Sequence, residues 1–363
     1  MSRKLTYDSW LFGSAMLILV VGMVMIYSAS AIIATQRFGH GPYYFLARQV
    51  AFLAGGAIAM VVLMHMNPAL LKDKRVVYGA LAAVGLALIL ALFQSPINGT
   101  HRWIVFPFFQ LQPSELAKPA IVLFFASYLT RREERINELT TLLPLGFILA
   151  LFAGLILLGR DFGTATVIIV VVSGMVFAAG LAWRYVAMFA MALIPIGGYF
   201  ALSAAYRRER LLTFLNPEAD SQGAGFQALQ SLIALGTGGV RGLGIGNGRQ
   251  KLFFLPEPHT DFIFSIIGEE LGFVGAIMLV GAFAFLVWRA FRVVRYSQDR
   301  FAFYAALGCT LMIAIQALIN VSVALCLLPT KGLPLPLVSY GGSSLIASLI
   351  AVGLLLNFSQ QAS

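Results

Sequence analysis

Charged residues are scarce in this sequence. Asp, Glu, Lys and Arg make up 11% of the 363 residues, whereas 60% are hydrophobic. Soluble domains carry about 25% charged residues, so the composition excludes an ordinary water-soluble protein and indicates a membrane protein. The net charge of +10 would suggest nucleic-acid binding in a soluble chain. In a membrane protein it is typical of cytoplasmic loops, so we expect no nucleic-acid partner.

Cysteine and histidine are also rare. Cys309 and Cys326 are the two cysteines. On one helix they would lie roughly 25 Å apart, which is too far for a disulfide bond. The four histidines are scattered, and no His or Cys cluster has the spacing of a metal site. The sequence therefore predicts neither a disulfide framework nor a metal site made of protein ligands.

Long apolar runs dominate the chain instead. They cover residues 10–33, 45–64, 76–93, 115–129, 142–158, 162–182, 185–204, 262–288, 301–328 and 337–358. A membrane-spanning helix needs about 20 such residues. The first run is longer than the roughly 7–15 residues of the apolar region of a signal peptide, so we expect it to remain as a helix. The fold predicted is an all-α polytopic membrane protein of about ten transmembrane helices, forming one domain over residues 1–363.

The basic residues orient this predicted bundle. With the N-terminus inside, thirteen fall in inner segments: Arg3, Lys4, Lys72, Lys74, Arg75, Arg131, Arg132, Arg135, Arg184, Arg289, Arg292, Arg295 and Arg300. Five fall in short outer connections: Arg37, Arg48, Arg102, Arg160 and Lys331. Cytoplasmic loops collect Lys and Arg. We therefore expect a multi-pass protein of the cytoplasmic (inner) membrane with both termini cytoplasmic.

One long extracytoplasmic loop, residues 205–261 between the seventh and eighth spans, breaks this charge bias. Its basic residues are Arg207, Arg208, Arg210, Arg241, Arg249 and Lys251. Outer basic residues favour an anionic partner, although long loops also cross a membrane regardless of charge. Loops of this length are usually functional. A glycine-dense run at 236–248 could offer backbone N–H groups to an anion, or simply be flexible.

Several charged residues lie inside predicted spans, where they are costly and usually functional. Glu115 and Lys118 share a helix face and form either an ion pair or a substrate contact. Asp161 opens the sixth span beside Arg160, with which it could pair. Glu269 and Glu270 point about 100° apart, so we expect one of them to pair with a basic residue elsewhere and neither to be catalytic.

Asp261 lies at the predicted start of the eighth span. Pro256 and Pro258 delay that helix and place Asp261 at the outer membrane surface, as a helix cap or as a functional carboxylate. His259 by itself is typical of a hydrogen-bonding surface residue. Pro334, Pro336 and the run 339–344, rich in Ser and Gly, open the last span. Such a segment must pack closely or line a cavity.

Four strings together resemble one family. They are Asn98-Gly-Thr-His-Arg-Trp103, Gln112-Pro-Ser-Glu-Leu-Ala-Lys118, Pro256-Glu-Pro-His-Thr-Asp-Phe-Ile-Phe264 and Gly332-Leu-Pro-Leu-Pro-Leu-Val-Ser-Tyr-Gly-Gly-Ser343. In this order they are similar to the SEDS family (shape, elongation, division and sporulation), which includes FtsW, RodA and SpoVE. Leu328-Pro-Thr-Lys-Gly332 and Gly246-Asn-Gly-Arg-Gln-Lys-Leu252 resemble the FtsW, or division, branch. At 159–161 the chain has Gly-Arg-Asp where the family usually has Gln-Pro-Asp, so only the local turn is in doubt.

The resemblance implies a peptidoglycan glycosyltransferase that polymerises lipid II on the outer face of the cytoplasmic membrane during septal wall synthesis. It implies partnership with a class B penicillin-binding protein, which crosslinks the strands, and with other membrane proteins of the division machinery. Asp261 matches the family's catalytic aspartate. The candidate substrate-binding residues are Arg48, Arg102, Glu115, Lys118, Asp161, Arg207, Arg208, Arg210, Arg241, Arg249, Lys251, His259, Lys331 and Ser339. A divalent cation (Mg or Mn) at the pyrophosphate remains open.

Three other functions stay open on the residues alone. An elongation-type polymerase would use the same chemistry. A flippase for lipid-linked precursors would need a polar path, which Glu115, Lys118, Asp161, Glu269 and Glu270 could line. A scaffold that only recruits a crosslinking enzyme would leave Asp261 and the loop arginines without a role.

Overall fold

The computed structural model describes residues 7–97, 99–107, 109–188, 191, 195, 198, 224–252, 254–329 and 332–361. Within these residues the chain is almost entirely helical. Its elements are α1 (Ser9–Gln36), α2 (Tyr44–His65), α3 (Pro68–Lys72), α4 (Lys74–Leu92), β1 (Ile104–Val105), β2 (Gln110–Leu111), α5 (Pro113–Arg132), η1 (Glu133–Arg135), α6 (Leu139–Leu158), α7 (Phe162–Ala178), α10 (Ala224–Gly238), α11 (Ile263–Tyr296), α12 (Arg300–Ala324) and α13 (Gly342–Ser359).

The predicted all-α polytopic fold is confirmed. Seven described helices are long and apolar enough to cross a membrane: α1, α2, α4, α6, α11, α12 and α13. The shorter apolar helix α7 and the charged helix α5 coincide with two further predicted spans. Most of the remaining predicted span, 185–204, and much of the loop 205–261 lie outside the described residues, so the number ten stays a prediction.

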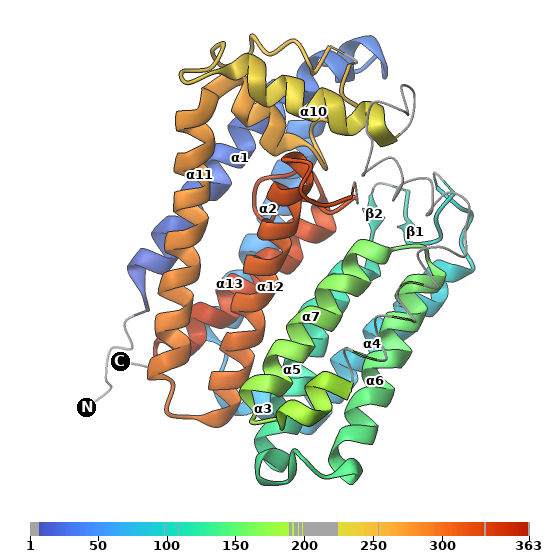
Figure 1. Ribbon diagram of the computed structural model, residues 1–363, viewed down its shortest axis with the longest axis vertical. Helices are drawn as coiled ribbons and strands as arrows, with labels where there is room; N and C mark the ends of the chain where they lie inside the picture. Colours follow the sequence, from blue (N-terminus) through green and yellow to red (C-terminus); the bar gives the residue numbers. More distant parts are fainter. Residues whose placement is uncertain are drawn as a thin grey trace.

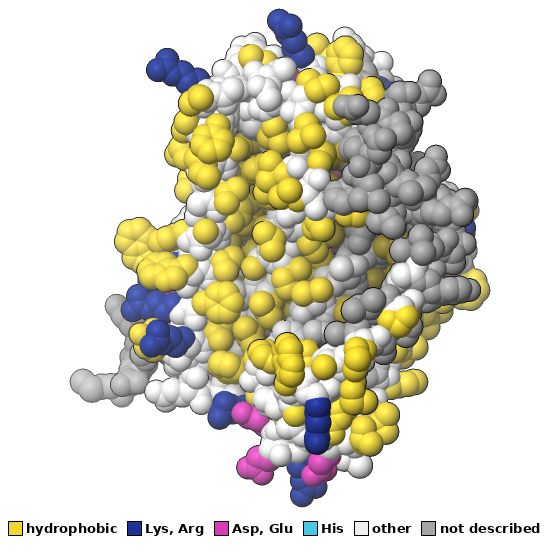
Figure 2. Space-filling model, in the orientation of Figure 1, with side chains coloured by type: hydrophobic (Ala, Val, Ile, Leu, Met, Phe, Trp, Pro, Cys, Tyr) yellow, Lys and Arg dark blue, Asp and Glu magenta, His cyan; other side chains and the backbone are white. Residues whose placement is uncertain are grey.

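The helices stand side by side as a bundle, with α10 lying across one end (Figure 1). The N-terminal end of α1 and the C-terminal end of α13 lie toward the opposite end in the same view. On the visible face, Lys and Arg side chains lie at the upper end, along the lower left edge and at the lower end, where Asp and Glu also gather, and the surface between them is mainly hydrophobic (Figure 2). This distribution suits a bilayer, whose hydrocarbon core is about 30 Å thick.

Helix α13 forms the centre of the bundle. It packs against α2, α5 and α12, and 83% of its apolar window is buried, against 17% for α2. Glycines permit the closest contacts, since a Cβ at Gly353 would lie 2.7 Å from the Met60 carbonyl oxygen, and one at Gly22 would lie 2.6 Å from the Val338 Cα. Small residues at helix contacts are how membrane helices pack without a hydrophobic driving force.

Two features shape the end of the bundle that carries α10. Ile104–Val105 and Gln110–Leu111 pair as a short antiparallel hairpin ahead of α5. Helix α11 is interrupted at Gly272, whose backbone (φ 69°, ψ −170°) is not helical. Such a conformation is open to glycine because it lacks a Cβ. The residues of α11 before Gly272 therefore form a separate segment at this end.

Candidate functional site

Asp261 lies in the turn that leads into α11. The helix begins at Ile263 with Phe262 at the N-cap. Asp261 therefore precedes the cap position by one residue, and the interpretation of Asp261 as the N-cap is wrong. Its side chain is partly exposed, as a group that meets a substrate must be.

The segment before α13 holds the Asp261 turn in place through hydrogen bonds to the backbone carbonyl groups of the turn. The backbone N–H of Tyr340 donates to the His259 carbonyl over 2.9 Å. The Ser339 hydroxyl donates to the Thr260 carbonyl over 2.5 Å and accepts the Leu335 N–H over 2.8 Å. Ser339, which we expected to bind substrate, is buried in these contacts. In the structure, Ser339 connects the segment before α13 to the turn that contains Asp261.

Gly332 brings the same segment against the carboxylate. A Cβ on this residue would lie 2.9 Å from Oδ2 of Asp261 and 3.6 Å from its Cγ. Only a residue without a side chain allows this approach at the observed backbone position. The family string at 332–343 and the string at 256–264 therefore meet at Asp261.

A cavity of about 260 Å³ opens directly beside this turn. Its wall includes Thr260 and His259 from the turn, and Arg37 and Arg48 from the end of α1 and from α2. The other lining residues are Ile33, Phe38, Phe45, Phe52, Trp103, Phe109, Gln110, Glu257, Pro258, Tyr340, Gly341 and Gly342. Aromatic surface with two guanidinium groups suits a ligand that has both apolar or sugar faces and negative charge.

His259 contributes a neutral ring to that wall. Its imidazole packs against Phe45 and Tyr340, with ring centroids 4.7 and 5.5 Å away. Burial, and then the positive charge of Arg37, lower its pKa from 6.5 to about 4. His259 is therefore uncharged near neutral pH, and the positive charge in the cavity wall comes from Arg37 and Arg48.

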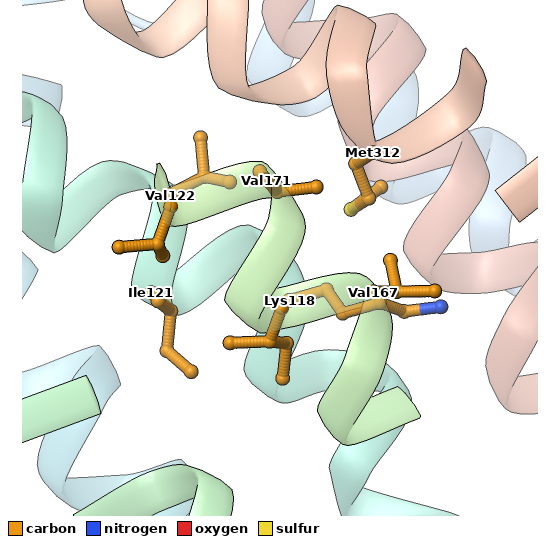
Figure 3. Close-up of a pocket in the computed structure, with 8 residues that line it drawn as sticks. Lys118, Ile121, Val122, Val167, Val171 and Met312 are labelled. Atoms are coloured by element: carbon orange, nitrogen blue, oxygen red, sulfur yellow. The ribbon is translucent and has the colours of Figure 1, made fainter. Parts of the chain in front are cut away.

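Glu115 and Lys118 form the predicted ion pair, 2.8 Å apart and almost completely buried. The Lys118 ammonium also donates to Gln316 on α12 over 2.5 Å. Figure 3 shows Lys118 among Val167, Val171 and Met312, around a space of about 10 Å³. That volume is about the size of one water molecule. Neither residue lines the cavity beside Asp261, so the described structure separates them from that site.

Asp161 is also buried, at the N-cap of α7. It accepts hydrogen bonds from Ser114 (2.7 Å), Gln112 (2.8 Å) and the Thr164 N–H (3.2 Å). Arg160 points elsewhere and donates to the Gly99 carbonyl. The interpretation of Asp161 and Arg160 as a pair is therefore wrong, because neighbouring hydroxyl and amide groups satisfy the carboxylate.

The glycine-dense run folds onto α11 and gives its N–H groups to carboxylates of the chain itself. Gly246 donates to Glu270 over 3.0 Å, and Arg249 and Gln250 donate to Glu269 over 2.7 and 3.1 Å. Lys251 forms a buried ion pair with Glu270 at 2.6 Å and donates to Ser28 of α1. One glutamate thus pairs with a basic residue, as expected, and the Lys251 charge points inward.

The other predicted cations are distributed around this end. Arg241 and Arg249 are exposed on the docked loop. Arg102 lies with its guanidinium 5.7 Å from the Trp103 ring centre, and Trp103 lines the cavity. Arg207, Arg208, Arg210 and Lys331 lie outside the described residues. Among the residues that the structure describes, no three His, Cys, Asp or Glu side chains lie together as a metal-binding group.

Sequence reasoning missed Arg37, counted only as an outer charge, and the buried amides Gln49, Gln316 and Asn320. Gln49 on α2 donates to the Ser339 carbonyl and accepts the Gly341 N–H. Gln316 donates to the Pro334 carbonyl over 2.8 Å. Their position inside apolar helices was the available signal, because amide side chains there usually make interhelical hydrogen bonds.

Known proteins resemble the chain over its full length. It is 42% identical over 359 residues to a probable peptidoglycan glycosyltransferase FtsW of Geobacter metallireducens, covering 97% of this chain and 94% of the relative. A chain of a peptidoglycan synthase complex, described for its coordination of polymerization and crosslinking, superposes with TM-score 0.81 at 32% identity, covering 98% of both chains. The rod shape determining protein RodA of Thermus thermophilus superposes with TM-score 0.72 at 30% identity, also covering 98% of both. The family model for FtsW, RodA and SpoVE, described as cell cycle protein, matches residues 8–363. The chain therefore belongs to the FtsW/RodA/SpoVE family.

Proposed function

We propose that this chain is a peptidoglycan glycosyltransferase of the division branch, which polymerises lipid II on the outer face of the cytoplasmic membrane and releases undecaprenyl pyrophosphate. The observation that carries the proposal is the meeting of Asp261 with Gly332, next to a cavity lined by Arg37 and Arg48. The names of full-length relatives at about 40% identity support the same activity.

Asp261 acts as the general base in this proposal. Strand extension joins the 4-hydroxyl of one lipid-linked sugar to the anomeric carbon of the other, and the hydroxyl loses its proton as the bond forms. A carboxylate within hydrogen-bond reach of that hydroxyl can accept the proton. The leaving pyrophosphate is already anionic and needs positive charge rather than an acid. One base beside cations therefore suffices, in contrast to the two carboxylates common in glycoside hydrolysis.

The arginines bind the anionic part of the substrate. Arg37 and Arg48 line the cavity, while Arg241 and Arg249 are exposed on the loop that ends at Asp261. Guanidinium groups bind phosphate oxygens in a bidentate way. The aromatic side chains of the same cavity offer faces for a sugar or for the first units of the lipid tail.

A flippase is less well supported. The polar groups that could have lined a path are engaged with each other: Glu115 with Lys118, and Glu270 with Lys251. The space at Lys118 has room for about one water molecule. An elongation-type polymerase would share the chemistry, and the RodA likeness is compatible with it. The FtsW names of the relatives favour division.

A class B penicillin-binding protein is the proposed partner, with other membrane proteins of the division machinery around it. The support is the likeness to a chain of a peptidoglycan synthase complex that couples polymerization and crosslinking. The expected contact involves α11 or α12. Co-purification of the two proteins in detergent tests this, and repeated failure, even with a crosslinker, would argue against the partnership.

Polymerisation of purified lipid II by the purified chain tests the function. The assay should run with and without the penicillin-binding protein, and with and without divalent cations. A polymerase makes glycan strands from lipid II in detergent. A flippase moves fluorescent lipid II across vesicles without making strands, and a scaffold does neither. Absence of strands in every arm would overturn the proposal.

A further inference from the structure

Asn320 is a buried amide in the apolar interior of α12. Its side chain is almost fully enclosed. Its Nδ2 donates to the Asp261 carbonyl over 2.9 Å and to the Leu333 carbonyl over 2.7 Å. Both partners can only accept hydrogen bonds, so the amide nitrogen must face them. One side chain therefore joins the turn of Asp261 to the segment that begins at Gly332.

The Asp261 carbonyl is the last of three consecutive backbone carbonyls that accept hydrogen bonds from other parts of the chain. The carbonyls of His259, Thr260 and Asp261 accept from Tyr340, Ser339 and Asn320 respectively. The intrahelical bonds of α11 start at the next carbonyl, that of Phe262, so these three groups need partners from elsewhere. The first two come from a loop. The third comes from a long helix, which is the more rigid support.

The position of Asn320 affects the distance between the Asp261 carboxylate and segment 332–333. Gly332 lies against the Asp261 carboxylate, and Leu333 follows Gly332 directly. Because Asn320 binds the backbone on both sides of this contact, it sets how far the carboxylate lies from segment 332–333. The hydrogen bonds reach backbone atoms only, so Asn320 affects the reaction through the positions of Asp261 and of segment 332–333.

We propose that Asn320 is a positioning residue for Asp261 in glycosyl transfer. The proposal rests on the role of Asp261 as base proposed above. A base works only within hydrogen-bond reach of the hydroxyl that it deprotonates. A displacement of about 1 Å in a reacting group can cost about 10²-fold in rate. Loss of Asn320 should therefore slow turnover more than it weakens substrate binding.

The chain offers a matched control at its other end. Asn357 on α13 is equally enclosed, and its Nδ2 donates to the carbonyls of Leu63, Met64 and Met66 over 2.8, 3.2 and 2.7 Å. It has the same type of structural contact, far from Asp261. Asn320→Leu removes two hydrogen bonds to backbone carbonyls and Asn357→Leu removes three, and both substitutions leave a similar volume.

The experiment measures kcat and KM for lipid II polymerisation by the full chain, with the melting temperature of each variant. Asn320→Leu should lower kcat about 10- to 100-fold with KM nearly unchanged. Asn357→Leu should lower the melting temperature and leave kcat close to wild type. Asn320→Ser, a milder variant, should change kcat in the same direction.

Three kinetic results would overturn the proposal: wild-type kcat in a folded Asn320 variant, an effect confined to KM, or an equal loss of kcat in Asn357→Leu. Failure of both Asn320 variants to fold would assign the residue a structural role and overturn it as well. Wild type and Asp261→Asn in the same assay keep the questions separate. If wild type makes no strands, the function fails. If Asp261→Asn makes glycan strands at the wild-type rate, the assignment of Asp261 as the general base is wrong.

Discussion

At the residue scale, the backbone of Gly332 lies close to the Asp261 carboxylate. We predict that Gly332→Ala lowers polymerisation with little change in melting temperature. The new Cβ would lie 2.9 Å from Oδ2, so the short Asp261 side chain must move away, and a misplaced base can cost 10-fold or more, up to about 10²-fold. Steady-state kinetics of the purified variant checks this.

Gly281→Ala is the control for that change, because a Cβ there meets nothing within 4 Å. It should keep wild-type turnover. Unchanged turnover in Gly332→Ala would mean that the carboxylate has room to move without losing its function.

His259 gives the protein a specific sensitivity to acid. Its pKa is about 4 in the folded chain, against about 6.5 in an unfolded one. Above pH 6.5 the imidazole is neutral in both states. As the pH falls from about 6.5 to about 4, the unfolded state binds a proton that the folded state excludes, so stability falls by roughly 3 kcal/mol.

We therefore predict that His259→Phe lessens the fall in melting temperature between pH 7.5 and 4.5. The substitution keeps an aromatic ring against Phe45 and Tyr340 and removes the titrating group. Thermal-shift curves at the two pH values give the comparison. An identical acid-induced fall in variant and wild type would show that His259 titrates normally.

At the element scale, the glycine-dense loop packs closely on α11, and this packing keeps Lys251 buried. A Cβ at Gly242 would overlap the Glu270 carbonyl oxygen and approach the Gly272 nitrogen to 2.6 Å. We predict that Gly242→Ala releases the loop and exposes Lys251, which is buried in the docked state. Trypsin should then cleave faster after Lys251.

Gly239→Ala separates this effect from backbone strain. Gly239 also has a positive φ, but a Cβ there meets nothing within 4 Å. It should carry only the left-handed backbone cost of roughly 1–2 kcal/mol and keep Lys251 protected. Equal cleavage of the two variants would indicate that the close packing of Gly242 against α11 is not what holds the loop in place.

Helices were predictable from the sequence because long apolar runs in a bilayer must satisfy their own backbone hydrogen bonds. Nine of the ten predicted segments coincide with described helices. The break at Gly272 was not predicted, because one glycine inside an apolar run does not reveal a positive φ. The docking of the loop was not predicted either, because it depends on Glu269 and Glu270, whose partners come from a different part of the chain.

The site was predictable only in part. Asp261 was located by its prolines and by the family string, but partners of its turn, such as Ser339, lie 79 residues away along the chain. Spacing along the sequence carries no information about such contacts. For the same reason, Lys251 and the loop arginines were grouped together, although Lys251 lies in a buried pair while Arg241 and Arg249 are exposed.

At the scale of the whole molecule, the charge distribution predicts that both termini are cytoplasmic. A cysteine at Val240, which is exposed near α10, should react with a membrane-impermeant thiol reagent added outside the cell. A cysteine at Gln298, between α11 and α12, should react only after the membrane is opened. Both belong in a background lacking Cys309 and Cys326. The reverse pattern would invert the orientation.

The central claim is that Asp261 takes the proton from the attacking hydroxyl. Asp261→Asn preserves the shape of the side chain and removes the base, and the N-cap at Phe262 does not depend on it. The deciding measurement is the rate of lipid II polymerisation by purified Asp261→Asn beside wild type, with folding checked by melting temperature. The account predicts a folded variant that is about 10²- to 10⁴-fold slower. Near-wild-type polymerisation by that variant, free of contaminating transferase, would contradict it.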